Sequence, residues 1–381
     1  MDETINNRLL VVDDDRVNRM VMGRYLENEG HQVEFAVNGL EALEKLRSNR
    51  FDMVLLDIEM PVMNGYQVLD QIRQEPLWRD MPVIVTSALE ELDSVVRCIE
   101  NGAEDYLVKP VNRVLLKARI DASLEKKRLR DQQTTLLNQL EREMEIARQT
   151  QQSILPEKLP GSLGYEFGAM MIPARSVGGD FYEFFDLGDE RWGIVIGDVS
   201  GKGLPAALFM TLTYSLMKAE AERSTDPGIV VREVNRHLLA MNASSMFVTI
   251  LYGILEGKTG AFNYARAGHL APALFDSQGS PVAVAMNLGQ PIGLFETFSI
   301  DEAIIQVPPN GLLVLSSDGL TEPVDPMDQE FGEQGVIAAV RSGWALPPQE
   351  VCAALWQAVQ KHSGPVDQQD DFTLVVVKRA G

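Results

Sequence analysis

The chain has 381 residues, of which 45% are hydrophobic and 23% are charged. This length suffices for two or three domains with buried cores, and the composition is that of a globular protein rather than a disordered or fibrous one. Its 55 Asp and Glu against 34 Lys and Arg give a formal net charge of −21, which would repel nucleic acid and anionic membrane surfaces. Neither nucleic acid nor membrane is therefore expected as a partner.

The N-terminus lacks the basic and then apolar pattern of a signal peptide, and no segment offers about 18 consecutive apolar residues. We therefore expect a soluble, cytoplasmic protein. The two cysteines, Cys98 and Cys352, lie far apart and outside any CxxC motif or histidine cluster. This indicates neither a disulfide nor a zinc site, and both are expected to fill the core.

In the first third of the chain, five short apolar runs alternate with amphipathic stretches. The runs cover residues 9–12, 33–36, 53–56, 82–85 and 106–108. Runs that are apolar on both faces are typical of strands inside a parallel sheet covered by helices. Residues 1–122 are therefore predicted to form a doubly wound α/β domain with a five-stranded parallel sheet, whose site lies at the carboxyl ends of the strands.

A long helix is predicted next, because residues 113–154 contain no proline and no glycine. Residues within it recur at alternating steps of three and four, which is the seam spacing of a coiled coil. We expect residues 123–159 to form a coiled-coil linker and residues 123–155 to pair two copies into a homodimer, with the polar Gln151 fixing the register. A helix that lies along its own domain is the alternative. The seam positions are Leu137, Leu140, Met144, Ala147, Gln151 and Ile154.

From Gly164 onward the pattern changes to many short β-prone runs separated by Gly, Pro and Asp. Three stretches with helical spacing, residues 204–222, 227–242 and 348–362, interrupt them. Residues 160–381 are therefore predicted to form an α+β domain, a sandwich of antiparallel sheets flanked by helices. The whole chain is predicted to be multidomain.

Three carboxylates are predicted to converge in the first domain. Asp13 and Asp14 follow the first predicted strand directly, and Asp57 ends the third. Their repulsion is best relieved by a divalent cation with oxygen ligands, and Mg²⁺ suits such a site. Ser87 and Lys109 end the fourth and fifth strands, which adds a hydroxyl and an ammonium group. The set describes a site for phosphoryl transfer to an aspartate.

Residues 7–122 resemble a two-component receiver domain. The resemblance rests on DDD at 13–15, LLDIEMPVMNG at 55–65, TSA at 86–88 and VKP at 108–110. It implies that Asp57 accepts the phosphoryl group from a cognate histidine kinase. It further implies a Mg²⁺ site at Asp57 with direct ligands from Asp14 and the backbone carbonyl of Glu59, with Asp13 acting through water. Ser87, Tyr106 and Lys109 would form the switch.

Further aspartates occur at the ends of apolar runs in the second domain, and none has a histidine beside it: Asp180, Asp198, Asp318 and the adjacent Asp370 and Asp371. Oxygen ligands alone favour Mg²⁺ or Mn²⁺ over zinc, and several carboxylates around one cavity suggest two ions. Two such ions lower the pKa of a bound water and clamp a phosphoryl group for in-line attack.

Residues 160–379 resemble the bacterial metal-dependent serine/threonine phosphatases of the PP2C class, in the branch that controls sporulation and stress sigma factors. The motifs are ARSVGGDFYEF (174–184), GDVSGKGLPAAL (197–208), ARAGHLAP (265–272), LGQPIG (288–293), SSDGLTE (316–322) and DDFTLVVV (370–377). The resemblance makes Asp198, Asp180, Asp318 and Asp370 the catalytic metal ligands.

In detail, the resemblance implies that Asp198 bridges two Mn²⁺ or Mg²⁺ ions with help from the carbonyl of Val199. Asp180 would belong to one ion, and Asp318 and Asp370 to the other. Asp371 is disfavoured because the family's ligand is the first residue of the D-[DN]-x-T motif. His269 is expected to be structural rather than a general acid. The helix that begins near Leu204 would lie against the site and regulate metal binding.

The predicted function is that of a response regulator in which phosphorylation at Asp57 controls a metal-dependent protein serine/threonine phosphatase. The branch resemblance implies a phosphorylated protein similar to an anti-sigma factor antagonist as substrate. The alternative is a non-catalytic adaptor that binds a sigma factor or an anti-sigma partner. The presence of all four metal-ligand aspartates favours the enzyme, because an adaptor does not need them.

Overall fold

The computed structural model describes the chain except for residues 1–5, 89–91, 157, 162–163 and 242–244. The chain divides into two compact units, residues 1–140 and 141–381. The predicted boundaries at residues 122 and 159 stay a prediction. In the part of the chain that the structure describes, no helix is both long and apolar enough to cross a bilayer.

The first unit is built on a five-stranded parallel sheet with the order β2-β1-β3-β4-β5. All five predicted apolar runs are strands. Their bounds are β1 Arg8–Val12, β2 Gln32–Ala36, β3 Met53–Asp57, β4 Val83–Ser87 and β5 Asp105–Val108.

Helices cover both faces of this sheet, as the doubly wound fold requires. Their bounds are α1 Arg16–Asn28, α2 Gly39–Ser48, α3 Gly65–Gln74, α4 Leu92–Glu100 and α5 Arg113–Gln152. Side chains of α2 and α3, and Cys98 of α4, form one core cluster with Leu10, Val54 and Val83. The opposite face packs against α1 and the start of α5.

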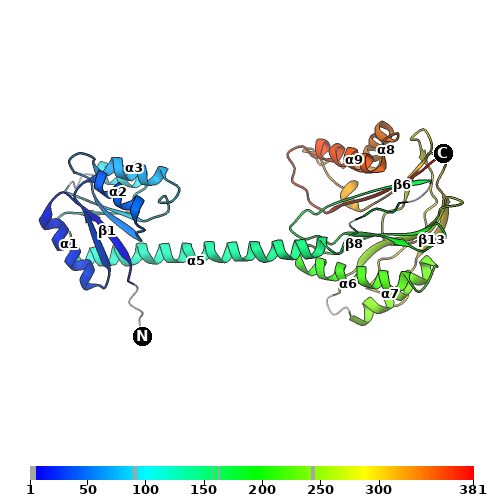
Figure 1. Cartoon of the computed structure of the whole chain (residues 1–381), viewed down its shortest axis with the longest axis horizontal. Coiled ribbons are helices and arrows are strands. Elements are labelled where there is room, and N and C mark those ends of the chain that lie inside the picture. Colours follow the sequence, from blue (N-terminus) through cyan, green and yellow to red (C-terminus); the bar gives the residue numbers. More distant parts are fainter. Residues whose placement is uncertain (1–5, 89–91, 157, 162–163, 242–244) are drawn as a thin grey trace. The chain divides into compact units, whose positions relative to one another are not determined.

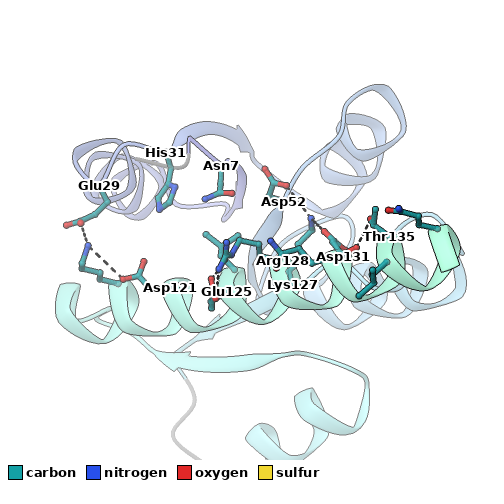
Figure 2. A pocket seen from close by; sticks show the side chains of 15 residues that line it. Asn7, Glu29, His31, Asp52, Asp121, Glu125, Lys127, Arg128, Asp131 and Thr135 are labelled. Atoms are coloured by element: carbon teal, nitrogen blue, oxygen red, sulfur yellow. Dashed lines mark hydrogen bonds and ion pairs between the residues drawn. The ribbon is translucent and has the colours of Figure 1, made fainter. Parts of the chain in front are cut away.

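Helix α5 has 40 residues and changes its surroundings along its length. Its start is anchored by the buried Leu116 and Ile120, and ion pairs continue the attachment, such as that from Lys127 to Asp52 at 3.4 Å. A groove of about 830 Å³ is lined by this helix and by residues of the first unit with charges of both signs. Figure 2 shows Glu29, His31 and Asn7 facing the helix across it. The middle of the helix, residues 131–143, is exposed.

The second unit contains two five-stranded sheets, ordered β13-β10-β9-β8-β7 and β12-β11-β14-β15-β6, in which all pairings are antiparallel. The strands of the first sheet are β7 Phe181–Asp186, β8 Arg191–Val199, β9 Val248–Glu256, β10 Ala261–Ala267 and β13 Asp301–Gln306. Those of the second are β6 Tyr165–Ile172, β11 Ala273–Phe275, β12 Pro281–Val282, β14 Leu312–Ser316 and β15 Phe372–Arg379.

The two sheets pack face to face, with side chains such as Ile194, Leu251 and Val375 in one shared core. Helices α6 Leu204–Ala221 and α7 Pro227–Met241 cover the outer face of the first sheet. Helices α8 Gly332–Gly343 and α9 Pro348–Ser363 cover the outer face of the second. Figure 1 shows these four layers, so the predicted antiparallel sheets flanked by helices are confirmed.

Two sequence expectations differ from the structure here. The α8 helix was not predicted, because its segment GEQGVIAAVRSG contains three glycines and gives a weak helical signal. Gln151 does not lie in a seam open to a second copy: it is 6% exposed and hydrogen-bonds the backbone of Gly178. Its predicted role in fixing a dimer register is therefore wrong, since its amide is used within the chain. The coiled coil itself stays a prediction.

Candidate active site

Three carboxylates meet at the carboxyl edge of the parallel sheet. Oxygens of Asp13, Asp14 and Asp57 all lie within 4.8 Å of one another. Asp13 and Asp57 are buried and Asp14 is exposed, so the group opens to solvent on one side. The strands bring them together because β1 and β3 are adjacent and parallel and therefore end at the same edge.

Lys109 neutralises part of this charge. Its Nζ lies 2.7 Å from Oδ2 of Asp13 and 2.7 Å from Oδ2 of Asp57. Burial raises the pKa of Asp57, and the hydrogen bond from Lys109 opposes this only in part. For Lys109, burial works against the charged form, but hydrogen bonds to both carboxylates outweigh it and raise the pKa of the ammonium group.

The predicted switch residues Ser87 and Tyr106 lie on the neighbouring strands β4 and β5. Ser87 ends β4 and is 1% exposed, while Tyr106 on β5 is 9% exposed and packs in the core cluster that contains Cys98. The tyrosine ring thus occupies an inward position. The backbone N–H of Glu59 donates to the Asp57 carboxylate.

Asp15, the third residue of the DDD motif, has a separate structural role. Its Oδ1 accepts from the backbone N–H groups of Val17 at 2.7 Å and Asn18 at 3.0 Å, so it is the N-cap of α1. An aspartate just before a helical pattern is the signal that could have predicted this cap.

The acids of the second unit lie where strands of both sheets end. Asp180 precedes β7, and Asp198 is near the end of β8, which pairs with β7. Asp318 follows β14, and Asp370 precedes the paired strand β15. Strand pairing thus places Asp180 beside Asp198 at one end of the first sheet, and Asp318 beside Asp370 at one end of the second. Among the described residues, no three acids of this unit have oxygens within 4.8 Å of one another, so this cluster is looser than that of the first unit.

Electrostatics links these acids nonetheless. Burial and the charge of Asp318 raise the pKa of Asp198 to about 7. Burial and the charge of Asp370 raise the pKa of Asp318 to about 6. Burial and the charge of Asp198 also raise the pKa of Asp180 well above its ordinary value. Carboxyl groups that resist ionisation in each other's presence are the expected state of a site built to share divalent cations.

The site fits cations with oxygen ligands in two further respects. Oδ2 of Asp180 is buried and accepts no hydrogen bond from the described residues. A Cβ on Gly179 would stand 2.8 Å from the carbonyl oxygen of Val199, so the glycine leaves that oxygen uncrowded. A buried, unpartnered carboxylate oxygen is costly without a ligand. The donor set therefore suits Mg²⁺ or Mn²⁺.

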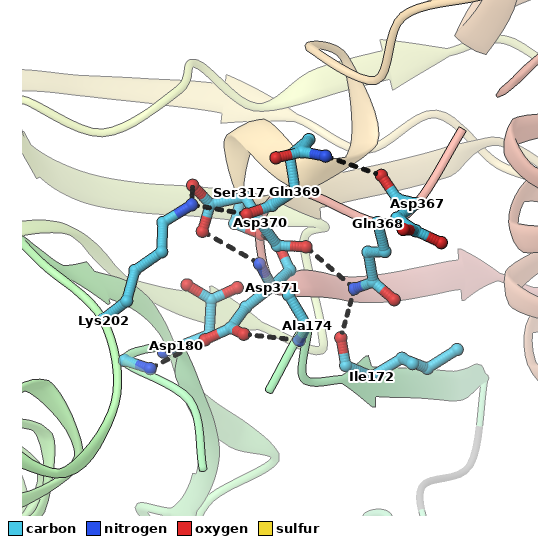
Figure 3. Close-up of polar contacts among 11 residues, drawn as sticks. Ile172, Ala174, Asp180, Lys202, Ser317, Asp367, Gln368, Gln369, Asp370 and Asp371 are labelled. Carbon is cyan, nitrogen blue, oxygen red and sulfur yellow. Dashed lines mark hydrogen bonds and ion pairs between the residues drawn. The ribbon is translucent and has the colours of Figure 1, made fainter. Parts of the chain in front are cut away.

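The neighbours Asp370 and Asp371 have different surroundings, as Figure 3 shows. Asp371 accepts hydrogen bonds at both oxygens, from the N–H of Ala174 at 2.8 Å and of Gly179 at 2.7 Å. Its carboxylate therefore holds the loop that carries Asp180. The Asp370 carboxylate points instead to Lys202, at 2.9 Å.

Lys202 was predicted only as part of the GKG motif. Its Nζ pairs with Asp370 and also donates to the carbonyl of Gln369. The α6 helix begins two residues later at Leu204, as expected, and its buried Ala206 packs in the same core cluster as Val199.

His269 is buried and hydrogen-bonded within the second unit rather than exposed to solvent. It is 4% exposed, and its Nδ1 lies 2.9 Å from the hydroxyl of Thr249. Arg266 donates to the carbonyl oxygen of His269 at 2.7 Å and forms an ion pair with the buried Asp301 at 2.8 Å. Burial lowers the pKa of His269 to about 4, so its ring is neutral near pH 7.

Comparisons with known proteins agree with both units. The Response regulator receiver domain family matches residues 9–121, and the Stage II sporulation protein E (SpoIIE) family matches residues 188–380. The Phosphoserine phosphatase RsbU of Bacillus subtilis is 29% identical over 243 residues, which are 63% of this chain and 71% of RsbU. Protein IcfG of Synechocystis is 29% identical over 266 residues, which are 62% of this chain but only 41% of IcfG.

Among solved structures, the SiaA-PP2C domain of Pseudomonas aeruginosa is similar, with a TM-score of 0.57 and 21% identity. The match covers 65% of this chain and 99% of that one, and it supports the fold. The receiver match, the two sheets and the family match together show a response regulator receiver domain fused to a PP2C-type phosphatase domain. The chain therefore belongs to the Stage II sporulation protein E (SpoIIE) family, with a receiver domain in front of the phosphatase domain.

Proposed function

We propose that this chain is a response regulator whose phosphorylation at Asp57 controls a metal-dependent protein serine/threonine phosphatase. The observation that carries the catalytic half is the burial and mutual repulsion of Asp180, Asp198 and Asp318, to which the charge of the more exposed Asp370 adds, because such a group calls for cations. The RsbU relative, which is called a phosphoserine phosphatase, supports the same reaction.

The phosphatase site would hold two Mn²⁺ or Mg²⁺ ions. Asp198 would bridge them with the carbonyl of Val199, Asp180 would bind one, and Asp318 and Asp370 the other. Bound there, such ions supply an activated water and neutralise charge on the phosphoryl group. The chain's own part is to hold these carboxylates in place, which Asp371 does for the loop before β7 through the N–H groups of Ala174 and Gly179.

In the receiver, Asp57 would accept the phosphoryl group from a cognate histidine kinase. Asp13, Asp14, Asp57 and the Glu59 carbonyl would provide a Mg²⁺ site, and Lys109 already pairs with Asp13 and Asp57. Ser87, Tyr106 and Lys109 would report the modification to β5 and α5. The substrate would be a phosphorylated protein similar to an anti-sigma factor antagonist.

The exposed part of α5 supports the proposed homodimer through residues 123–155. Leu137 and Leu140 lie in a described stretch of this helix and are about half exposed, at 52% and 48%. Pairing with a second copy would remove this apolar surface from water. Sedimentation of the purified chain tests the pairing, and a monomer at micromolar concentration would contradict it.

Metal-dependent turnover is the direct test of the catalytic half. Hydrolysis of p-nitrophenyl phosphate and of a phosphoserine peptide should require Mn²⁺ or Mg²⁺. Asp198→Asn should lower kcat/KM by about a hundredfold or more, since it removes a bridging charge. Calorimetric titration with Mn²⁺ should show weaker binding for the variant. Metal-independent hydrolysis, or equal Mn²⁺ binding by both proteins, would refute the proposal.

The same variant separates the enzyme from the adaptor. Used as bait, Asp198→Asn should retain a phosphorylated protein that the unaltered chain releases as dephosphorylated product. Recovery of a sigma factor alone, equally with both baits, would instead favour the adaptor.

A further inference from the structure

A pocket of about 380 Å³ lies beside the phosphatase acids and shares only Asp370 with the proposed metal ligands. Three segments form it: the chain after Asp318, the C-terminal half of α9, and the loop that ends at Asp370. Its volume is within the range of pockets that bind small groups, about 300–1,000 Å³.

The floor of this pocket is apolar and aromatic. Trp356 lies on α9 and packs against Phe372, with ring centroids 4.9 Å apart. Pro323, Val324 and Val359 also line the pocket. A surface of this kind accepts the aliphatic stem of a long side chain, and an indole ring also attracts a cation.

The rim of the pocket is acidic. Glu322, Asp367 and Asp370 line it, and no lysine or arginine is among its lining residues in the described chain. Figure 3 shows Asp367 on the opposite side of the loop from Lys202. The pair of Lys202 with Asp370 therefore leaves Asp367 and Glu322 to set the charge of the pocket. An apolar floor with carboxylates at its edge is complementary to an arginine.

The pocket and the candidate active site are formed in part by the same segments of the chain. Asp370 belongs to both, and Gly319 of the pocket follows Asp318 directly. The loop is held in place by Gln368, which donates to the carbonyls of Ile172 and Asp370 at 2.8 Å each. A bound segment with its phosphoryl group at these acids would therefore pass beside this pocket.

We propose that this pocket binds an arginine side chain of the substrate protein, placed within a few residues of the phosphorylated serine or threonine. The number of intervening residues is limited because an extended chain covers about 3.3 Å per residue. The net charge of −21 also favours approach of a basic segment. This inference rests on the proposed phosphatase function and deepens it by assigning a determinant of substrate choice.

The test uses phosphoserine peptides with a single arginine moved from four residues before to four residues after the phosphoserine, beside an all-alanine reference. In two further peptides, lysine or glutamate replaces the arginine at the preferred position. Lysine keeps the positive charge without the guanidinium shape, and glutamate reverses the charge. For the full chain with Mn²⁺, one or two arginine positions should raise kcat/KM about tenfold over the reference. Lysine should give a smaller gain, and glutamate should give none.

The variant that tests the pocket is Glu322→Gln combined with Asp367→Asn. It should reduce the ratio of kcat/KM between the arginine and alanine peptides to about one. The ratio within each protein is the readout, so a general change in turnover does not affect it. Lys361→Gln, an exposed change on α9 outside the pocket lining, is the matched control and should keep the preference.

A binding measurement keeps this test separate from the proposed catalytic function. Fluorescence anisotropy should show the labelled arginine peptide binding about tenfold more weakly to the double variant than to the unaltered chain, even without turnover. Hydrolysis of p-nitrophenyl phosphate reports the catalytic function alone. The inference is overturned if the unaltered chain shows no arginine preference in either assay, or if the double variant keeps it.

Discussion

The adjacent acids Asp370 and Asp371 show how two identical side chains acquire different roles. Asp371 is 8% exposed, and both of its oxygens accept backbone N–H groups from the loop before β7. Asp370 faces Lys202 and is more accessible. Asp370 is also partnered within the chain, since its Oδ1 accepts the backbone N–H of Asp371 at 2.9 Å, but it is the more accessible of the two. This accessibility supports the prediction of Asp370 rather than Asp371 as a metal ligand.

This contrast gives a paired prediction. Asp371→Asn should destabilise the second unit by about 1–3 kcal/mol, because an amide nitrogen cannot accept the hydrogen bond from Ala174 or Gly179. Asp370→Asn should leave stability nearly unchanged while it weakens Mn²⁺ binding. Urea unfolding followed by tryptophan fluorescence measures the first effect, and calorimetric titration measures the second. Equal loss of stability in both variants would contradict the assignment.

His269 predicts a pH dependence of stability. Its pKa is lowered by burial to about 4, against an ordinary value of 6.5. Between these values the unfolded chain binds a proton that the folded chain does not, so stability falls as pH drops from about 6.5 to about 4. A shift of this size corresponds to about 3 kcal/mol. The nearby Arg266 cation acts in the same direction.

The measurement for His269 is a difference between proteins. The free energy of unfolding of the unaltered chain and of His269→Gln should be compared at pH 7 and pH 5, with saturating Mn²⁺. The loss on acidification should be smaller in the variant. Other groups titrate in both proteins and cancel. Parallel pH profiles would show that the pKa of His269 is the same in the folded and unfolded states, so that burial does not lower it.

Which residues could be predicted from the sequence depends on how local their partners are. The acids at strand ends were found because short apolar runs followed by aspartate give a local signal. Lys202 was not assigned its contact, since its partner Asp370 lies 168 positions away and only the folded chain brings them together. The hydrogen bond of Gln151 to Gly178 was not predicted. A polar residue in a heptad pattern is consistent both with a contact between two helices of a dimer and with a hydrogen bond inside its own chain.

At the scale of elements, the sequence predicted strands of the parallel sheet better than the small helices of the second unit. All five apolar runs of the receiver are strands, because buried parallel strands have an uninterrupted apolar signal. Helix α8 was not predicted, because its glycines weaken the helical signal of the sequence. The 3-10 turn at Asp318–Leu320 was also not predicted, since a single turn leaves no periodic pattern.

The end of α5 is joined to the candidate active site by one side chain. The Gln151 amide donates to the carbonyl of Gly178 at 2.7 Å and accepts from its N–H at 3.1 Å. Gly178 lies two residues before Asp180, and the next N–H in the chain, that of Gly179, is bound by Asp371. Movement of the helix end would therefore move the loop that carries Asp180.

Replacing Gln151 tests this connection. Gln151→Ala should destabilise the second unit by about 2 kcal/mol or more, because it leaves a buried N–H and a buried carbonyl unpaired. It should also speed hydrogen exchange across residues 177–180. Gln149→Ala, on the exposed face of the same helix, is the control and should change stability by less than about 0.5 kcal/mol. Equal effects of both changes would show that Gln151 does not connect the end of α5 to the loop that carries Asp180.

At the scale of the whole chain, the continuous helix α5 begins in the first unit and ends in the second. Lys109, which pairs with Asp13 and Asp57, lies shortly before α5 begins at Arg113. A phosphoryl group on Asp57 would add negative charge and draw Lys109 toward itself, which changes the position of the segment that enters α5. The other end of that helix holds the loop before Asp180 through Gln151.

Phosphorylation should therefore change phosphatase turnover. Treating the purified chain with a small phosphodonor such as acetyl phosphate, in the presence of Mg²⁺, should alter kcat/KM for a phosphoserine peptide by about 5-fold or more. Coupling between sites typically amounts to about 1–3 kcal/mol, which corresponds to changes of this size. Asp57→Ala should be insensitive to the phosphodonor while its basal turnover is kept, since Asp57 takes no part in hydrolysis.

Gln151→Ala should accept the phosphoryl group as the unaltered chain does, yet its turnover should change less on phosphorylation. If Asp57→Ala responds like the unaltered chain, the receiver does not control the phosphatase through this residue.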